Sequence, residues 1–191
     1  DESAEPGGRL LSEVEEVGGM PAAAWAEQTL RRLAAMPNVR VMARTTVTGA
    51  YDHGSYGALE RVGEHVAHPD ADLPRTCFWR IDAARAALAA GALERPVALP
   101  GNDRPGVMLA SAVRSYVTRY GVAPGRSVAV FGANDDAHRT ARDLAAAGVK
   151  VAALIDARDV ALAGDFPTYA KGTVTGTRGR QGLTGIRLRH K

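Results

Sequence analysis

The sequence predicts an α/β fold that combines a parallel β-sheet with an antiparallel β-meander. Three observations lead to this prediction. Residues 127–155 have the order strand, glycine turn, helix and strand, which is that of a βαβ unit. Three runs rich in Val, Thr and aromatic residues lie between positions 39 and 81 and are typical of consecutive strands. Residues 172–188 contain a glycine-rich turn between two further strand-like runs.

The composition is that of a folded chain. Of 191 residues, 46% are apolar and 24% are charged, and 24 Lys and Arg against 21 Asp and Glu give a formal net charge of +3. This balance excludes a disordered chain, which combines low hydrophobicity with high net charge. Cys77 is the only cysteine, so a disulfide scaffold within the chain is excluded. No uncharged apolar run of about 18 residues is present, and we expect a cytoplasmic protein with no membrane partner.

Basic residues gather toward the end of the chain. After the last acid, Asp165, come Lys171, Arg178, Arg180, Arg187, Arg189 and Lys191. They alternate with Thr, Val, Ile and Gly, as on the exposed face of a hairpin, and no recognition motif accompanies them. We therefore expect no nucleic-acid partner.

The first half of the chain predicts one helix followed by the meander. Apolar residues recur at three-to-four spacing over residues 22–36, which favours a helix that begins after Pro21 and ends before Pro37. Residues 39–47, 57–66 and 77–81 predict the three antiparallel strands.

The middle of the chain is less regular. Residues 83–92 are mostly alanine, which favours a helix, but their short length equally permits a buried strand. Prolines and glycines between residues 96 and 106 predict an irregular linker. Residues 109–120 return to helical spacing and end at Gly121.

The βαβ unit predicts a Rossmann-like parallel sheet of the FAD/NAD(P)-binding type. Residues 127–131 and 149–155 form the expected buried strands, and residues 137–147 form the expected helix, capped by Asp135 and Asp136. The hairpin expected over residues 172–188 completes this half.

The turn of this unit is poorly suited to a dinucleotide. Dinucleotide sites use glycines after the first strand to let the pyrophosphate approach a helix N-terminus. Here Gly132 is present, but Asn134 replaces the middle glycine, and two carboxylates follow it. Asp156 does stand at the end of the next strand, where an acid can bind ribose. We favour a structural unit without ligand over a nucleotide site at this turn.

The start of the chain carries a complementary signal. Asp1 and Glu2 precede Gly7, Gly8 and Arg9, which suits the end of the second strand of a dinucleotide domain, where a carboxylate accepts hydrogen bonds from ribose. The chain begins at Asp1 and not at methionine, so we expect a piece of a longer polypeptide with incomplete domains.

The other groups of potentially reactive residues give little support for a metal site or a reactive thiol. His53, His65 and His68 lie close in sequence, but a solvated loop explains them better than a metal site. Cys77 precedes Phe78 and Trp79 and is expected to be a small core residue.

Several segments resemble the alpha subunits of heterotetrameric sarcosine oxidases, and the related subunits of opine and cyanide-forming amine oxidases. The resemblance covers essentially the whole chain. Its segments are Asp1-Glu2 with Gly7 to Leu10, residues 44–47, Tyr51-Asp52-His53, residues 91–96, residues 101–110, residues 119–122, and Asn134-Asp135 with Arg139 to Ala141.

This resemblance implies a flavoprotein with two dinucleotide-binding domains. Residues 1–106 would be the C-terminal part of the first domain with its meander, and residues 107–191 an inserted, incomplete second domain. In such complexes NAD binds the alpha subunit, while FAD and FMN lie on or against the beta subunit. The cofactor-binding residues implied are Asp1, Glu2, Gly8, Arg9, Thr46, Val47 and Gly91. Ala90 stands where the family usually has a threonine before that last glycine.

The implied function is that of an oxidoreductase subunit acting on a CH–NH bond. The complex would oxidatively demethylate a secondary amine and reduce O2 to H2O2, with no catalytic residue in this chain. Two alternatives stay open: a fragment of an NAD(P)H-dependent flavoprotein reductase, and a ligand-free Rossmann-like interaction module. Unpaired strand edges also predict that the isolated chain self-associates.

Overall fold

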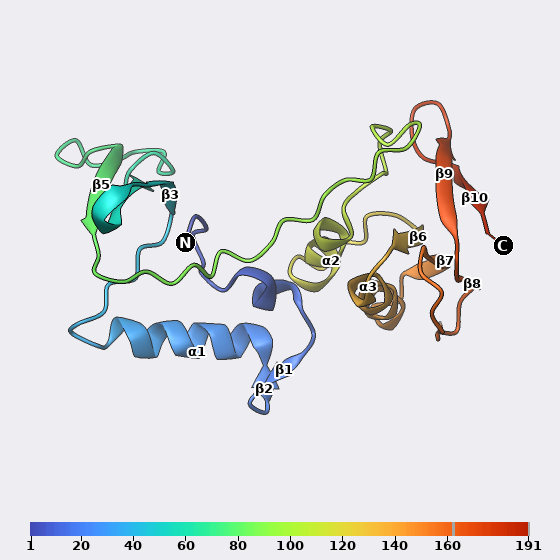
Figure 1. The fold of residues 1–191 in the computed structure, drawn as a ribbon, viewed down its shortest axis with the longest axis horizontal. Coiled ribbons are helices and arrows are strands. Elements are labelled where there is room, and N and C mark those ends of the chain that lie inside the picture. The colour runs from blue at the N-terminus through green and yellow to red at the C-terminus, as the bar shows by residue number, and fades with distance from the viewer. Residues whose placement is uncertain (162, 191) are drawn as a thin grey trace. The chain divides into compact units, whose positions relative to one another are not determined.

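The computed structural model describes residues 1–161 and 163–190, which divide into two compact units. Unit 1 comprises Asp1–Leu11 and Glu15–Gly91, and unit 2 comprises Ser12–Val14 and Ala92–Lys191. Figure 1 shows the elements of both. The predicted division into two nucleotide-binding-type domains, residues 1–106 and 107–191, is a different division of the chain and stays a prediction.

Unit 1 opens with short elements that lead into its one long helix. The 3-10 helix η1 (Gly8–Ser12) is followed by the two-residue strands β1 (Glu16–Val17) and β2 (Met20–Pro21), which pair antiparallel. Helix α1 (Ala22–Ala34) confirms the predicted helix and buries Ala22 and Ala26. It ends before Pro37, whose ring disfavours helical backbone in the preceding residue.

The predicted three-stranded meander is confirmed, although its second strand ends at Arg61 and residues 62–66 lie outside it. Strands β3 (Thr45–Ala50), β4 (Ser55–Arg61) and β5 (Thr76–Asp82) form an antiparallel sheet in the order β3-β4-β5. The 3-10 turn η2 (Asp52–Gly54) links β3 to β4.

Other predictions for this part of the chain are wrong. The first strand was expected from residue 39, but it begins at Thr45, because Arg44 has a left-handed φ of 51° that interrupts the extended backbone. Residues 83–92 form neither a helix nor a strand. Leu88 in this segment is 95% exposed, and a short helix without a packing surface is not stable in water.

Unit 2 contains the predicted βαβ unit. Strand β6 (Ser127–Gly132) leads through α3 (Asp135–Ala146) to β7 (Lys150–Asp156), and the two strands pair in parallel. Strand β8 (Thr168–Tyr169) extends the parallel sheet to the order β6-β7-β8. The α/β fold with a parallel sheet and an antiparallel meander is therefore confirmed.

The sheet of unit 2 is covered on both faces. Helix α2 (Ala110–Thr118), which confirms the second predicted helix, packs with α3 in a core that includes Val113, Leu144 and Leu154. The predicted hairpin is confirmed as β9 (Thr173–Arg178) and β10 (Gly185–Arg189). It packs Val174 and its apolar neighbours against Ala153 and Ile155 of β7. The result is a helix layer, a parallel sheet and a hairpin layer.

Among residues 1–161 and 163–190, no helix combines the length and the apolar character needed to cross a bilayer.

Candidate functional site

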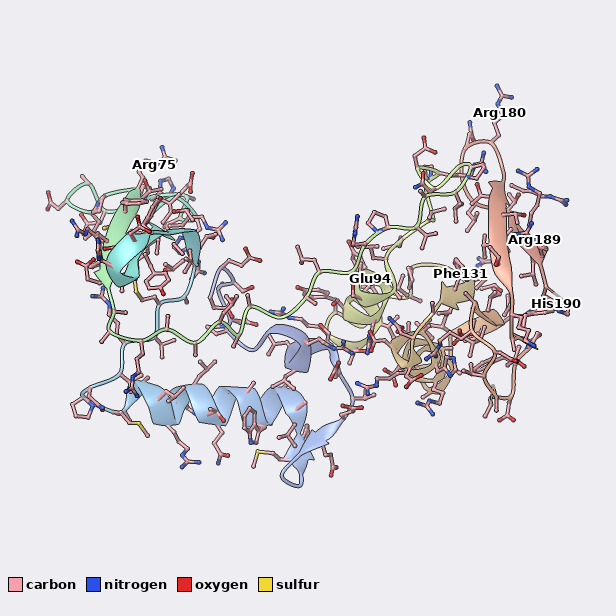
Figure 2. The ribbon with its side chains drawn as sticks, viewed as in Figure 1. Arg75, Glu94, Phe131, Arg180, Arg189 and His190 are labelled. Carbon is pink, nitrogen blue, oxygen red and sulfur yellow. The ribbon has the colours of Figure 1, made fainter. Side chains whose placement is uncertain are left out.

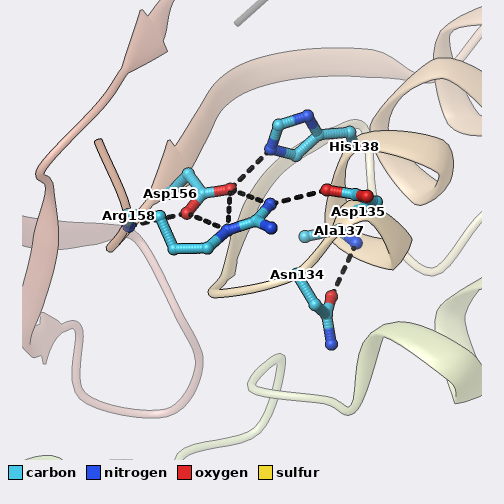
Figure 3. Close-up of polar contacts among 6 residues, drawn as sticks. All are labelled: Asn134, Asp135, Ala137, His138, Asp156 and Arg158. Atoms are coloured by element: carbon cyan, nitrogen blue, oxygen red, sulfur yellow. Dashed lines mark hydrogen bonds and ion pairs between the residues drawn. The ribbon is translucent and has the colours of Figure 1, made fainter. Parts of the chain in front are cut away.

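The carboxyl ends of β6 and β7 meet the N-terminus of α3 in unit 2, and polar side chains gather there (Figure 3). Asn134 is the residue that caps α3, because its side-chain oxygen accepts a hydrogen bond from the Ala137 backbone N–H at 3.2 Å. The prediction that Asp135 and Asp136 provide the cap is therefore wrong. Both lie one step later, in the first turn of the helix.

Arg158 binds two carboxylates at this edge. Its backbone N–H donates to Asp156 Oδ1 at 2.7 Å, and its Nη2 donates to Asp156 Oδ2 at 2.8 Å. The same Nη2 donates to Asp135 Oδ1, also at 2.8 Å. His138 Nε2 lies 2.6 Å from Asp156 Oδ2. Asp156 is fully buried, so these contacts replace the water that its carboxylate has lost.

These contacts hold Asp156 in its charged form. The side-chain hydrogen bonds from Arg158 lower the pKa of Asp156 to about 2, against the opposing effect of burial. The Arg158 backbone N–H and His138 lower it further. The pKa of Arg158 is raised in turn, first by its hydrogen bonds to Asp156 and then by those to Asp135.

This arrangement leaves little for a pyrophosphate to bind. A helix N-terminus attracts phosphate through free N–H groups and a positive dipole end. Here Asn134 already accepts from one N–H, and Asp135 and Asp136 place negative charge in the first turn. The edge is better suited to fixing α3 against β7 than to holding an anion.

A second charged cluster lies inside unit 2. The Arg114 side chain is 3% exposed, and its Nη2 donates to Asp136 Oδ2 at 2.8 Å. Its Nη1 lies 3.7 Å from Glu13 Oε1, and Arg139 Nη1 lies 3.6 Å from the same oxygen. The cluster ties the short segment Ser12–Val14 to α2 and α3. Sequence reasoning missed it, because Glu13 and Arg114 are about a hundred residues apart in the chain.

In unit 1, Asp1 and Glu2 lie beside the start of β3. Thr45 N–H donates to the Asp1 carbonyl at 2.8 Å, and Arg61 Nη2 donates to the Glu2 carbonyl at 2.7 Å. Neither residue belongs to a strand of the structure. Their side chains are exposed, as are those of Thr46 and Val47 on the strand that their backbone contacts.

The other predicted cofactor residues lie on separate segments of unit 1. Gly8 and Arg9 begin η1, and Gly8 has a φ of 52° that favours glycine. Gly91 has a φ of 70° and lies at the end of the irregular segment that follows β5. The hydrogen bonds that bring Asp1 and Glu2 to the meander involve none of these three residues.

The weaker candidates have no site around them. In the part of the chain that the structure describes, no group of three or more His, Cys, Asp or Glu side chains could hold a metal ion. Cys77 is a half-buried free thiol on β5.

Comparison with known proteins identifies relatives along the whole chain. No family model matches. The sarcosine oxidase subunit alpha of Rhizobium meliloti (strain 1021) is 46% identical over 193 residues, which cover 100% of this chain and 20% of the relative. The proteins of the same name from Corynebacterium sp. strains P-1 and U-96 are 45% and 41% identical over 160 residues, 83% of this chain and 16% of each relative. The chain thus spans at most a fifth of the length of these relatives.

A solved structure shares the fold. The crystal structure of L-proline dehydrogenase from P. horikoshii superposes with a TM-score of 0.69 at 18% identity, over 99% of this chain and 34% of that chain. At this identity the likeness concerns the fold alone. The identity to the three alpha subunits confirms the resemblance predicted from the sequence: this chain is homologous to one segment of the sarcosine oxidase alpha subunits.

Proposed function

We propose that this segment belongs to a subunit of a sarcosine-oxidase-like complex and that unit 1 contributes part of an NAD site. The observation that carries the proposal is the 46% identity to a sarcosine oxidase alpha subunit over the whole chain. Domains 1–106 and 107–191, a cytoplasmic location and a flavin-carrying beta subunit as partner form part of the same proposal.

The residues of unit 1 suit the ribose half of a dinucleotide. The Asp1 and Glu2 side chains are exposed, and the Asp1 carbonyl binds Thr45, next to Thr46 and Val47 on the same strand. Carboxylates accept hydrogen bonds from ribose hydroxyls. Gly8, Arg9 and Gly91 complete the proposed set. The described part of the chain contains no glycine turn between a strand and a helix that could cradle the pyrophosphate in unit 1. We therefore assign only ribose binding to these residues.

The reaction proposed for the complex is the oxidation of a secondary amine at its CH–NH bond, with demethylation and reduction of O2 to H2O2. A bound flavin, FAD or FMN, would accept the hydride. No residue of this chain is assigned a catalytic role.

One observation favours a second role for unit 2, that of a protein-interaction module that binds no nucleotide. Arg158, His138 and Asn134 satisfy the polar groups that a nucleotide would otherwise bind. The same observation weighs against an NAD(P)H-dependent reductase, which needs an open glycine turn in its second domain.

The test is NAD binding to the full-length subunit by calorimetry. Glu2→Ala removes the proposed ribose acceptor but keeps the backbone carbonyl that Arg61 binds. We expect the NAD dissociation constant to rise about tenfold or more, since a hydrogen bond to a charged group is involved. Glu64→Ala, in the exposed loop between β4 and β5, is the matched control and should leave it unchanged. Equal affinities for both variants would remove Glu2 from the site.

A further inference from the structure

The outer face of the β9-β10 hairpin is basic and exposed. Arg178 ends β9, Arg187 and Arg189 lie two residues apart on β10, and all three are exposed. The inner face, by contrast, packs Val174, Ile186 and Leu188 toward β7. Figure 2 shows Arg189 on β10 and a further arginine, Arg180, at the turn of the hairpin. We call Arg178, Arg187 and Arg189 together the basic face.

Small residues stand opposite each arginine of the basic face. Antiparallel register pairs Arg178 with Gly185, Arg187 with Gly176 and Arg189 with Thr173. A Cβ atom added at Gly176 would lie 2.7 Å from Arg187 Nη2, so this guanidinium lies directly over the glycine. Glycine inside a strand often marks a place where a ligand or another chain approaches closely. The guanidinium groups are therefore presented over backbone, with no large apolar side chain paired to them.

The charges of the basic face are not balanced inside the chain. Other basic groups of unit 2 have carboxylate partners at 2.8 Å: Arg114 has Asp136, Arg158 has Asp156 and Asp135, and Lys171 has Asp159. Across residues 1–161 and 163–190, no hydrogen bond or ion pair joins a guanidinium of the basic face to another side chain. Residues 166–191 contain no Asp or Glu at all. These guanidinium groups are therefore available to carboxylates from outside the chain.

We infer that the basic face docks on an acidic, carboxylate-rich surface of another subunit of the proposed complex. The inference rests on the proposed role of unit 2 as a protein-interaction module, and it adds the surface and the chemistry of the partner. Arginine is enriched in protein interfaces, and its planar group binds a carboxylate through two parallel hydrogen bonds. Three such groups on one strand pair can bind several carboxylates at once.

The observations favour a protein partner over a polyanion. Nucleic acid would be attracted by the same charges, but no recognition motif accompanies them. The three curated relatives are each named as a subunit, so partner subunits belong to the complexes of those proteins. An acidic surface of such a partner complements the basic face in charge.

The experiment is zero-length crosslinking of the assembled complex, purified with the full-length subunit. Arg187→Lys and Arg189→Lys, made one at a time, place a primary amine on the basic face, and a carbodiimide joins that amine to a carboxylate in direct contact. Arg142→Lys is the matched control, because Arg142 is exposed on α3, in the helix layer on the other side of the sheet. Background from this segment is low, because it contains only three lysines, Lys150, Lys171 and Lys191.

Mass spectrometry of the crosslinked peptides gives the result. We expect Arg187→Lys and Arg189→Lys to yield hairpin peptides joined to an Asp or Glu of another subunit, and Arg142→Lys to yield none. Absence of such peptides from both hairpin variants would overturn the inference. Crosslinks of the hairpin to a second copy of this chain alone would also contradict it.

Charge reversal tests the same face through assembly. In a variant that combines Arg187→Glu and Arg189→Glu, we expect the dissociation constant of the subunit from its complex to rise about tenfold or more at low salt, and the difference to shrink as salt is added. Arg142→Glu should leave it unchanged. Hydrogen exchange of β9 peptides, equal to wild type, shows that the reversed hairpin is folded.

The outcomes separate the inference from the proposed function. A wild-type subunit that joins no complex would contradict both. A wild-type complex whose dissociation constant is the same in the reversed variant would exclude the basic face alone. Binding of the wild-type complex to duplex DNA or to phosphatidylserine vesicles that is lost in the reversed variant, while assembly is unchanged, would assign the face to a polyanion and would contradict the inference.

Discussion

Arg158 donates hydrogen bonds from both its backbone and its guanidinium to the carboxylate of Asp156, only two residues earlier in the chain. The pair lies at the carboxyl end of β7, where parallel sheets of this type usually bind ligands. Arg158 also reaches Asp135 on α3, and His138 of the same helix contacts Asp156. The residues that could meet a ligand therefore bind one another.

Because the pKa of Asp156 is lowered in the folded state, we expect the free energy of unfolding of unit 2 to depend on pH. Its pKa of about 2 is below the ordinary value of 3.8, so the folded state binds the proton less readily than the unfolded state does. The stabilisation, on the order of 2 kcal/mol, is present above about pH 4 and is lost as the pH falls toward 2. Asp156→Asn should destabilise unit 2 at pH 7, and the difference from wild type should shrink below pH 4.

The measurement for Asp156→Asn is native-state hydrogen exchange of peptides from β6 and β7, corrected for the pH dependence of intrinsic exchange. Tryptophan fluorescence would not report on this unit, because Trp25 and Trp79 both belong to unit 1. A difference between the two proteins that stays constant from pH 7 to pH 2 would show that the charge of Asp156 is not the stabilising group.

We expect unit 2 to lose much of its stability when the charge of Arg114 is removed and the size of its side chain is nearly kept. Arg114→Met keeps much of the side-chain volume but takes a cation from beside Glu13 and Asp136. Glu13 is nearly fully buried, and breaking a buried ion pair from one side costs about 3 kcal/mol or more. Urea unfolding followed by hydrogen exchange of α2 and α3 peptides should show this loss. Arg142→Met, at an exposed position of α3, should have little effect. If the two variants are equally stable, the cluster around Arg114 contributes nothing.

We expect the Glu94 side chain to stabilise the first turn of α2. Its carboxylate accepts from two consecutive backbone N–H groups that the helix itself leaves without partners. Glu94→Ala should cost about 1 kcal/mol, as the loss of a capping residue does. Glu94→Gln, with one carbonyl acceptor, should fall between Ala and wild type. The amide exchange rates of residues 110–111 measure the effect, with Asp103→Ala as an exposed control on the same segment. Unchanged rates in Glu94→Ala would mean that water replaces the carboxylate without loss.

Sequence patterns predicted the strands and helices whose residues pack in a regular period. The apolar run that became β6 and the three-to-four spacing that became α2 are examples. The strand expected over residues 39–47 was wrong over residues 39–44, since the left-handed φ of Arg44 has no signal in side-chain periodicity. The prediction of a helix or a strand over residues 83–92 was wrong, because the propensities of single residues cannot show that a segment lacks a packing partner.

The polar contacts were harder to predict than the elements. Asp156 stood out because it ends a buried strand, but its partner Arg158 did not, since a short loop can turn a side chain in any direction. The contact of His138 with Asp156 depends on the register of α3 against β7, which only the folded chain fixes. Asn134 was recognised as the residue that replaces a glycine, yet its capping role was assigned to the two acids that follow it.

The last prediction separates the two candidate nucleotide sites. If unit 2 binds no dinucleotide at residues 132–137, then Asp135→Ala should leave NAD and NADPH binding by the full-length subunit unchanged, whereas Glu2→Ala should weaken NAD binding. Asp135 suits this test because its side chain is 92% exposed and its removal takes away one contact of Arg158, which keeps its hydrogen bonds to Asp156. A pyrophosphate at this helix N-terminus would be repelled by the carboxylate, so removing it would tighten binding. Calorimetry with both nucleotides gives the answer. Tighter binding in Asp135→Ala would place a phosphate at α3 and would assign unit 2 the ligand that its polar contacts argue against.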